Sequence, residues 1–392
     1  MNQSVLLFDE LNIRGVALPN KIVVSPMCMY SALDGLAQPF HAIHYGKFAL
    51  GGAGTAIVEA TAVSAEGRIS NGCLGLWSDA HAAALQPIAA SFSSHGVVPG
   101  IQLNHAGRKA SAQRAFEGNG PLSEENIANG DRRWEIIAPS AVPFDDGWLM
   151  PQEMTRVDMD RVKDDFAAAA HRAVQAGFRL VELHMAHGYL LQSFLSPLAN
   201  KRTDAYGGSL ENRMAFPLEV AHAVRGVLPS DIPLFARISA TDWIDGGWEV
   251  GDSIELARRL KHTGVDLVVC SSGGNLSGTT TNVNLKRGPA YQAEFSRKIR
   301  TEAQVSTATV GLIRQPKLAE SLLRNGYADL IAVGREMLLD PFWAHRARAE
   351  LIPNSDFDEW PEQYGWWLSK WKRGIGDLNA EAWPDFLPHW SV

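Results

Sequence analysis

The feature that most constrains the fold is a recurring unit: an amphipathic helix, a glycine that ends it and a short β-branched run. Four copies are readable, and their strand runs are residues 97–103, 179–184, 265–270 and 329–333. Thr155 and Asp252 are expected to cap two of the helices, and Pro316 is expected to begin another. Such alternation is typical of a parallel sheet covered by helices.

Four further strand-like runs bring the predicted β segments to eight, the number of strands in a TIM barrel. These runs are residues 21–25, 55–60, 233–238 and 305–310. Together with the four above they predict a single α/β domain, a (β/α)8 TIM barrel. An open doubly wound sheet remains the structural alternative, because alternation along the chain does not show whether the sheet closes.

Two segments depart from the repeat. Residues 1–352 are expected to form the barrel, with a loop excursion after the third strand at about 108–151 that is rich in Gly, Pro, Asn and charge. Residues 353–392 form a tail that holds Trp360, Trp366, Trp367, Trp371, Trp383 and Trp390. Two interpretations of the tail stay open: the rings pack on their own barrel, or some cross to a neighbouring subunit.

Charge and cysteine content narrow the class of function. The 392-residue chain has 36 basic and 43 acidic residues and a net charge of −7, so no positive field attracts nucleic acid or a membrane surface. No signal peptide or membrane span is expected. Cys28, Cys73 and Cys270 form no C-x-x-C pair, and any disulfide scheme would leave one of the three unpaired. This favours a reducing, cytoplasmic setting. A small molecule is the expected partner.

The chemistry is expected where the strands end, because active sites of TIM barrels lie at the C-terminal ends of the strands. These ends contribute Ser25, Pro26, Met27, Cys28, Tyr30, Ala60, Gln102, His184, His187, Tyr189, Arg237, Gly311, Gly334 and Arg335. The glycines after the last strands allow a phosphate to approach the backbone, and an arginine side chain can hold that phosphate with two hydrogen bonds. The glycine-rich residues 51–54 precede a strand and are expected at the opposite end.

His184 and His187 allow three interpretations. They are metal ligands, histidines merely satisfied in a loop, or paired donors of hydrogen bonds to a substrate oxygen with Tyr189 beside them as proton donor. A metal site needs a third ligand, and Glu182 is expected on the opposite face of the strand from His184. We therefore predict no metal and favour the paired donors, while a metal-dependent TIM-barrel hydrolase remains the alternative function.

Segment 184–213 resembles the most recognisable segment of the old yellow enzymes, which are FMN-containing ene-reductases built on a TIM barrel. Shorter runs at 25–30, 102–109, 138–141 and 334–335 extend the similarity to about residue 345. Cys28 and Tyr30 resemble the branch that includes the thermophilic-type enzymes and the xenobiotic reductases. Residues 364–368 of the tail also resemble xenobiotic reductase.

The resemblance implies an FMN site made from the same strand ends. It implies contacts to FMN from the backbone of Ser25, Pro26, Met27 and Cys28, from Ala60, from the Gln102 amide, from Arg237 near flavin N1, and from Gly311, Gly334 and Arg335 at the phosphate. Cys28 is expected against the flavin ring, where it tunes the redox potential; its alternative role is that of a small buried apolar residue.

The resemblance also implies an NAD(P)H oxidoreductase with a ping-pong mechanism. NADPH or NADH gives hydride to flavin N5 and leaves, and an activated alkene that carries a carbonyl or nitro group then takes its place. His184 and His187 bind the activating oxygen, Tyr189 protonates the α-carbon, and Tyr30 adds a hydrogen bond or a pocket wall. Trp367 is expected to reach the site of a neighbouring subunit, which implies a homodimer or a higher homo-oligomer.

Overall fold

The last strand of the sheet pairs with the first, so the sheet is closed. The computed structural model describes residues 4–276, 287–353 and 355–376. Within them β12 lies parallel to β3 with Ile331 opposite Ile22, and the remaining neighbours complete the barrel. The barrel strands are β3 (Ile22–Val24), β4 (Thr55–Ala62), β5 (Val98–Asn104), β8 (Leu180–Met185), β9 (Leu234–Ser239), β10 (Leu267–Ser271), β11 (Ser306–Val310) and β12 (Leu330–Val333). The TIM-barrel prediction is confirmed, and the doubly wound alternative is wrong.

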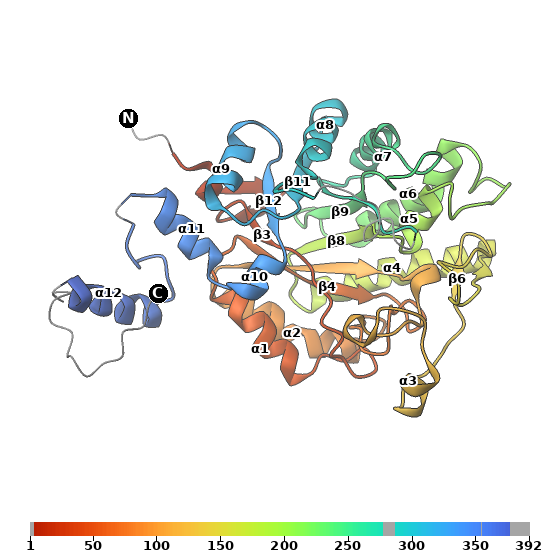
Figure 1. The fold of residues 1–392 in the computed structure, drawn as a ribbon, viewed down its shortest axis with the longest axis horizontal. Helices are drawn as coiled ribbons and strands as arrows, with labels where there is room; N and C mark the ends of the chain where they lie inside the picture. Colours follow the sequence, from red (N-terminus) through yellow and green to blue (C-terminus); the bar gives the residue numbers. More distant parts are fainter. Residues whose placement is uncertain (1–3, 277–286, 354, 377–392) are drawn as a thin grey trace.

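Helices surround the strands, as Figure 1 shows. They are α1 (Pro39–Ala49), α2 (Asp79–Ser94), α4 (Arg156–Gln175), α6 (Leu210–Val227), α7 (Val250–His262), α8 (Ala293–Ala303), α9 (Pro316–Arg324) and α11 (Trp343–Leu351).

The ends of these helices test the expected caps. The Thr155 side chain caps α4 by accepting from the Asp158 N–H, and Pro316 opens α9, as predicted. The expected cap at Asp252 is wrong. Glu249 is the N-cap of α7, and Asp252 lies one turn inside, where its side chain bonds back to the Glu249 backbone N–H.

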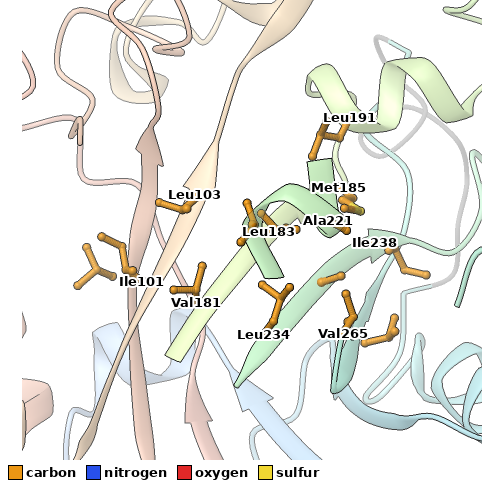
Figure 2. Packing of buried hydrophobic residues seen from close by; sticks show 14 of the residues in the cluster. Ile101, Leu103, Val181, Leu183, Met185, Leu191, Ala221, Leu234, Ile238 and Val265 are labelled. Carbon is orange, nitrogen blue, oxygen red and sulfur yellow. The ribbon is translucent and has the colours of Figure 1, made fainter. Parts of the chain in front are cut away.

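The strands bury two different faces. Outward residues such as Val181, Leu183 and Met185 of β8 pack between the sheet and the helices, beside Leu234 and Ala221 (Figure 2). Inward residues form a second apolar cluster in the barrel, which includes Ile57, Leu180, Phe235, Leu267, Val269 and Leu330. Because side chains alternate along a strand, the inward positions that follow toward the C-terminal ends are Glu182, His184, Arg237 and Ser271. The interior therefore turns polar at that end.

The N-terminal end of the barrel is closed by apolar packing. The hairpin of β1 (Leu11–Ile13) and β2 (Val16–Leu18) adds Val16 and Leu18 to the inward cluster. The glycine-rich residues 51–54 lie at this end, directly before β4. A Cβ on Gly54 would lie 2.2 Å from the Asn20 carbonyl oxygen, so close packing of the backbone accounts for this glycine.

The loop after β5 is elaborated. It contains η2 (Gly107–Lys109), η3 (Ala115–Glu117), α3 (Glu124–Ala128) and β6 (Ile137–Ala138), and β6 pairs with β7 (Gln152–Glu153). Two further short helices follow strands: α5 (Leu190–Leu195) after β8 and α10 (Arg335–Leu339) after β12.

The tail combines a packed tryptophan with exposed ones. Trp360 stacks on His345, with ring centroids 4.3 Å apart, and on Phe342 at 5.2 Å. In α12 (Glu362–Gly376), which extends away from the barrel in Figure 1, Trp366, Trp367 and Trp371 are 56%, 64% and 60% exposed. Trp383 and Trp390 lie outside the described residues. None of the helices in the described part of the chain has the length and apolarity to cross a bilayer.

Candidate active site

A cavity of about 550 Å³ opens at the C-terminal ends of the strands, within the size range of ligand pockets. Most residues predicted to hold a cofactor line it: Ser25, Pro26, Met27, Arg237, Gly311, Gly334 and Arg335. Arg314, Tyr291 and Ser271 line it as well. Cys28, Ala60 and Gln102 are not among the residues that line this cavity.

One part of the cavity wall leaves no room for a side chain at Gly311. Gly311 has φ +128°, and a Cβ there would lie 2.9 Å from the Tyr291 ring and 3.0 Å from the Gln292 amide nitrogen. Gly334 directly precedes α10, and Gly334, Arg335 and Glu336 line the same cavity, with Arg335 exposed. Backbone N–H groups together with an arginine suit an anionic group such as phosphate.

A buried polar group lies deeper in the barrel. The Gln102 amide donates to Glu182 Oε1 over 2.6 Å, and Arg237 interacts with the same carboxyl group. Burial raises the pKa of Glu182 to about 7, against the opposing effects of Arg237 and Gln102. Among the described residues, Arg237 Nε, Glu182 Oε2 and Ser25 Oγ are buried without a hydrogen-bond partner. Such atoms favour a polar ligand that would pair with them.

Our expectation for Glu182 is therefore wrong. Residues two apart on a strand share a face, so Glu182 and His184 both point into the barrel. Gln102 donates to one oxygen of this carboxyl group, Oε1. The described residues contain no group of three His, Cys, Asp or Glu side chains that could hold a metal ion.

Cys28 and Tyr30 lie where the chain leaves β3. Both pack against the small cluster of Ile69, Cys73 and Ala106. Burial raises the pKa of the Cys28 thiol, and the nearby Glu59 raises it further, so Cys28 is a thiol at neutral pH. The Ala60 backbone donates to this sulfur, which brings the two predicted cofactor residues together.

His184 and His187 face each other across the end of β8. His184 Nε2 lies 3.4 Å from His187 Nδ1, with ring planes at 85°. The Ala186 N–H donates to His184 Nδ1, so the proton of neutral His184 sits on Nε2. Burial lowers the pKa of both imidazoles, and Arg237 and Lys109 lower both further. The pair is therefore neutral at pH 7 and suited to donate hydrogen bonds.

Tyr189 stands edge-on to this pair. Its ring centroid is 4.8 Å from that of His184, and its backbone caps α5. Burial raises the pKa of the Tyr189 phenol, so the group holds its proton throughout the neutral range. The predicted trio of His184, His187 and Tyr189 is thus brought together in one place.

Sequence reasoning missed Lys109 and left Glu59 unplaced. Lys109 Nζ donates to the carbonyl oxygens of His187 (2.9 Å) and Gly274 (3.2 Å), and its pKa is lowered by burial to about 7. Glu59 is fully buried on β4 and accepts from the Met29 N–H at 2.9 Å. Lys109 stood inside the 102–109 run that carried the resemblance, and Glu59 stood at a strand end. These two positions were the only hints that the sequence offered. Neither of them shows which distant residues Lys109 and Glu59 contact.

A closed barrel with an anion-suited rim and a neutral histidine pair at its strand ends has the form of a TIM-barrel enzyme site. Comparison with known proteins identifies the enzyme family. The model of the NADH:flavin oxidoreductase / NADH oxidase family matches residues 6–354, and the chain belongs to this family. It is an FMN-dependent oxidoreductase of the old yellow enzyme type.

Individual proteins agree with this assignment. An NADPH dehydrogenase of Geobacillus sp. is 46% identical over 348 residues, which are 88% of this chain and 94% of that protein. The structure of an old yellow enzyme homologue from Zymomonas mobilis matches with a TM-score of 0.72 and 25% identity, over 89% of this chain and 94% of that chain. A 2-naphthoyl-CoA reductase shares the fold (TM-score 0.77, 23% identity); this chain spans only 52% of it.

The residues present fit FMN. Arg237 and Ser25 line the cavity, and among the described residues Arg237 Nε and Ser25 Oγ have no partner; a Cβ on Gly311 would meet Tyr291 and Gln292 of the same wall. A guanidinium beside a hydroxyl and free backbone suits a ligand that carries both an anionic phosphate and a polar ring system.

Proposed function

We propose that this protein reduces the C=C bond of activated alkenes, α,β-unsaturated carbonyl or nitro compounds, by a ping-pong mechanism with NADPH or NADH as the hydride donor. The observation that carries the proposal is the neutral His184–His187 pair with the protonated Tyr189 edge-on to it. NADPH is the donor that the name of the Geobacillus relative supports.

FMN, when bound, would supply the hydride chemistry that links oxidation of the nicotinamide to reduction of the alkene at its β-carbon. Ser25, Pro26, Met27, Cys28, Ala60 and Gln102 would hold its ring system, with Arg237 compensating the negative charge of the reduced ring. Gly311, Gly334 and Arg335 would hold its phosphate, which the position of these residues on the cavity wall supports.

His184 and His187 bind the carbonyl or nitro oxygen of the alkene. Their nitrogens converge to 3.4 Å, so one oxygen can accept from both. Because both imidazoles are neutral, they polarise the alkene by hydrogen bonding and withdraw charge from the β-carbon. Lys109, which holds the His187 carbonyl, keeps this ring in position.

Tyr189 supplies the proton. Its phenol would give a proton to the α-carbon while the β-carbon takes hydride, so that the C=C bond is reduced to a C–C bond with two new C–H bonds and Tyr189 is left as a phenolate. A phenol whose pKa is raised by burial is an acid and not a base at neutral pH. Tyr30 packs near Tyr189 in the same cluster and would close the pocket or add a hydrogen bond.

The tail and the cellular setting complete the proposal. Residues 1–352 would act as the FMN-binding barrel, and residues 353–392 would contact a second subunit of a homodimer or higher homo-oligomer through Trp367. The 64% exposure of Trp367 supports a contact outside its own barrel. Cys28, Cys73 and Cys270 are all free, which supports a reducing compartment, the cytoplasm.

An anaerobic visible spectrum tests the function. The purified protein is expected to be yellow, to bleach with NADPH and to regain its colour with cyclohexenone. Bleaching without recovery would refute alkene reduction while leaving the flavin in place. A colourless protein that FMN cannot reconstitute would refute the flavin site, and zinc analysis would then test the hydrolase alternative.

A further inference from the structure

Ser271 connects the histidine pair to Gln292, which directly precedes α8. This buried serine ends β10, and its Oγ lies 2.7 Å from His187 Nε2. The same oxygen lies 3.5 Å from Gln292 Oε1, which already accepts a shorter bond of 2.6 Å from Ser272. Gln292 is itself fixed by donating to the Val310 carbonyl at 2.8 Å. The strong hydrogen bond of Ser271 is therefore the one to His187.

The backbone of His187 is held from both sides. Its N–H donates to Ser239 Oγ at 3.0 Å, and Ser239 in turn donates to the Gly273 carbonyl at 2.7 Å. Its carbonyl accepts from Lys109 Nζ. The residue also has φ +61°, a left-handed conformation that a non-glycine residue keeps only where its surroundings enforce it. These contacts fix the backbone of His187. The tautomer of its ring can still vary.

The free site and the ligand-bound site require different tautomers of His187. In the free site His184 Nε2 carries a proton and faces His187 Nδ1, so Nδ1 accepts and the His187 proton sits on Nε2, where Ser271 Oγ accepts it. When a substrate oxygen accepts hydrogen bonds from both facing nitrogens, both nitrogens must donate, so the proton must move to His187 Nδ1. His187 Nε2 then needs a donor, and a hydroxyl is able to turn from acceptor to donor.

We infer that Ser271 is a positioning residue that selects the tautomer of His187, accepting from Nε2 in the free enzyme and donating to Nε2 when an oxygen ligand is bound. The inference rests on the proposed function, since it requires an oxygen between the histidines. The pair neither gains nor loses a proton overall: the proton on Nε2 is released to solvent water, and solvent water supplies the proton on Nδ1.

The test uses the FMN-loaded enzyme and 4-nitrophenol, whose phenolate oxygen stands in for the activating oxygen of the substrate. Ser271→Ala leaves His187 Nε2 without a donor. The variant is expected to bind the phenolate about tenfold more weakly. It is also expected to raise the pKa of the bound phenol, read from phenolate absorbance against pH. Histidine ¹⁵N NMR of the complex should show Nδ1 protonated in the wild type and not in the variant.

Matched variants isolate the hydroxyl. Ser272→Ala removes a neighbouring serine that bonds Gln292 and not His187, and it should bind like the wild type. Ser271→Thr keeps a hydroxyl and should restore binding. Ser271→Cys keeps the volume with a poorer donor, and it gives the same comparison if the alanine variant loses FMN.

The outcomes separate the inference from the function beneath it. Equal binding and equal ¹⁵N shifts in Ser271→Ala and the wild type would overturn the role of Ser271. Failure of the wild type itself to bind 4-nitrophenol as the phenolate would instead refute the oxygen site between His184 and His187.

Discussion

Tyr45 binds Glu59 twice: its hydroxyl accepts from the Glu59 backbone N–H at 2.9 Å and donates to the Glu59 carboxyl oxygen Oε1 at 3.0 Å. The other carboxyl oxygen accepts from the Met29 N–H at 2.9 Å. A group buried on β4 therefore holds the segment that carries Cys28 and Tyr30. The left-handed Tyr30, with φ +52°, lies at the end of that segment.

Glu59 should make stability depend on pH. Burial raises its pKa from 4.5 to about 7. Between these values the folded protein keeps a proton that the unfolded chain has released, so stability should fall as pH rises through this window. For Glu59 alone the loss is about 3 kcal/mol. Glu59→Gln resembles the protonated form and should flatten this fall, measured as the free energy of urea unfolding against pH.

One control variant and one parallel variant accompany that measurement. The exposed Glu302→Gln should leave the pH dependence unchanged. Glu182→Gln should also flatten it, because burial raises the pKa of Glu182 in the same way. A Glu59→Gln protein with the pH dependence of the wild type would mean that Glu59 is charged in the folded state.

Removing the Tyr189 hydroxyl should affect one half-reaction only. In Tyr189→Phe, reduction of cyclohexenone should slow by about a hundredfold or more, because the acid is gone. Reduction of the flavin by NADPH needs no proton from Tyr189 and should keep its rate. Stopped-flow spectroscopy measures the two steps separately, and equal losses in both would exclude the acid role.

A methyl group on Gly311 should weaken FMN binding. Alanine there would meet the Tyr291 ring and the Gln292 amide at φ +128°. We expect FMN affinity to fall by roughly ten- to a hundredfold. Release of FMN on dilution, followed by flavin fluorescence, measures this. Gly288→Ala is the control, since in the described part of the chain no atom beyond its two neighbours lies within 4 Å of the added Cβ. Retention of wild-type affinity in Gly311→Ala would remove this glycine from the site.

Two tail tryptophans should behave differently. Trp360→Ala removes the ring stacked on His345 and Phe342 and should lower stability by about 1–2 kcal/mol. Trp367→Ala removes an exposed ring and should leave the stability of the single chain nearly unchanged. If Trp367 contacts a second subunit, its loss should instead lower the mass seen by light scattering or raise KM for the alkene. No change in either would separate Trp367 from the site.

Local signals in the sequence were enough to place the strands. Each of the predicted strand runs overlaps an observed barrel strand, because β-branched runs and helix-ending glycines are properties of neighbouring residues. The grouping of His184, His187 and Tyr189 was also predictable, since one strand end and the following turn carry all three. Asp252 was misplaced because Glu249 and Asp252 form a reciprocal cap, and the sequence pattern does not show which of them stands outside the helix.

By itself, then, the sequence determined the order of strands and helices and the end of the barrel that carries polar residues, and it predicted which side chains react. Only the tertiary structure decided which partners surround them. Ser271 meets His187 across 84 positions of the chain, and Gln102 meets Glu182 across 80. Such pairs depend on how the strands register when the barrel closes, and that register is set by the packing of all eight strands together.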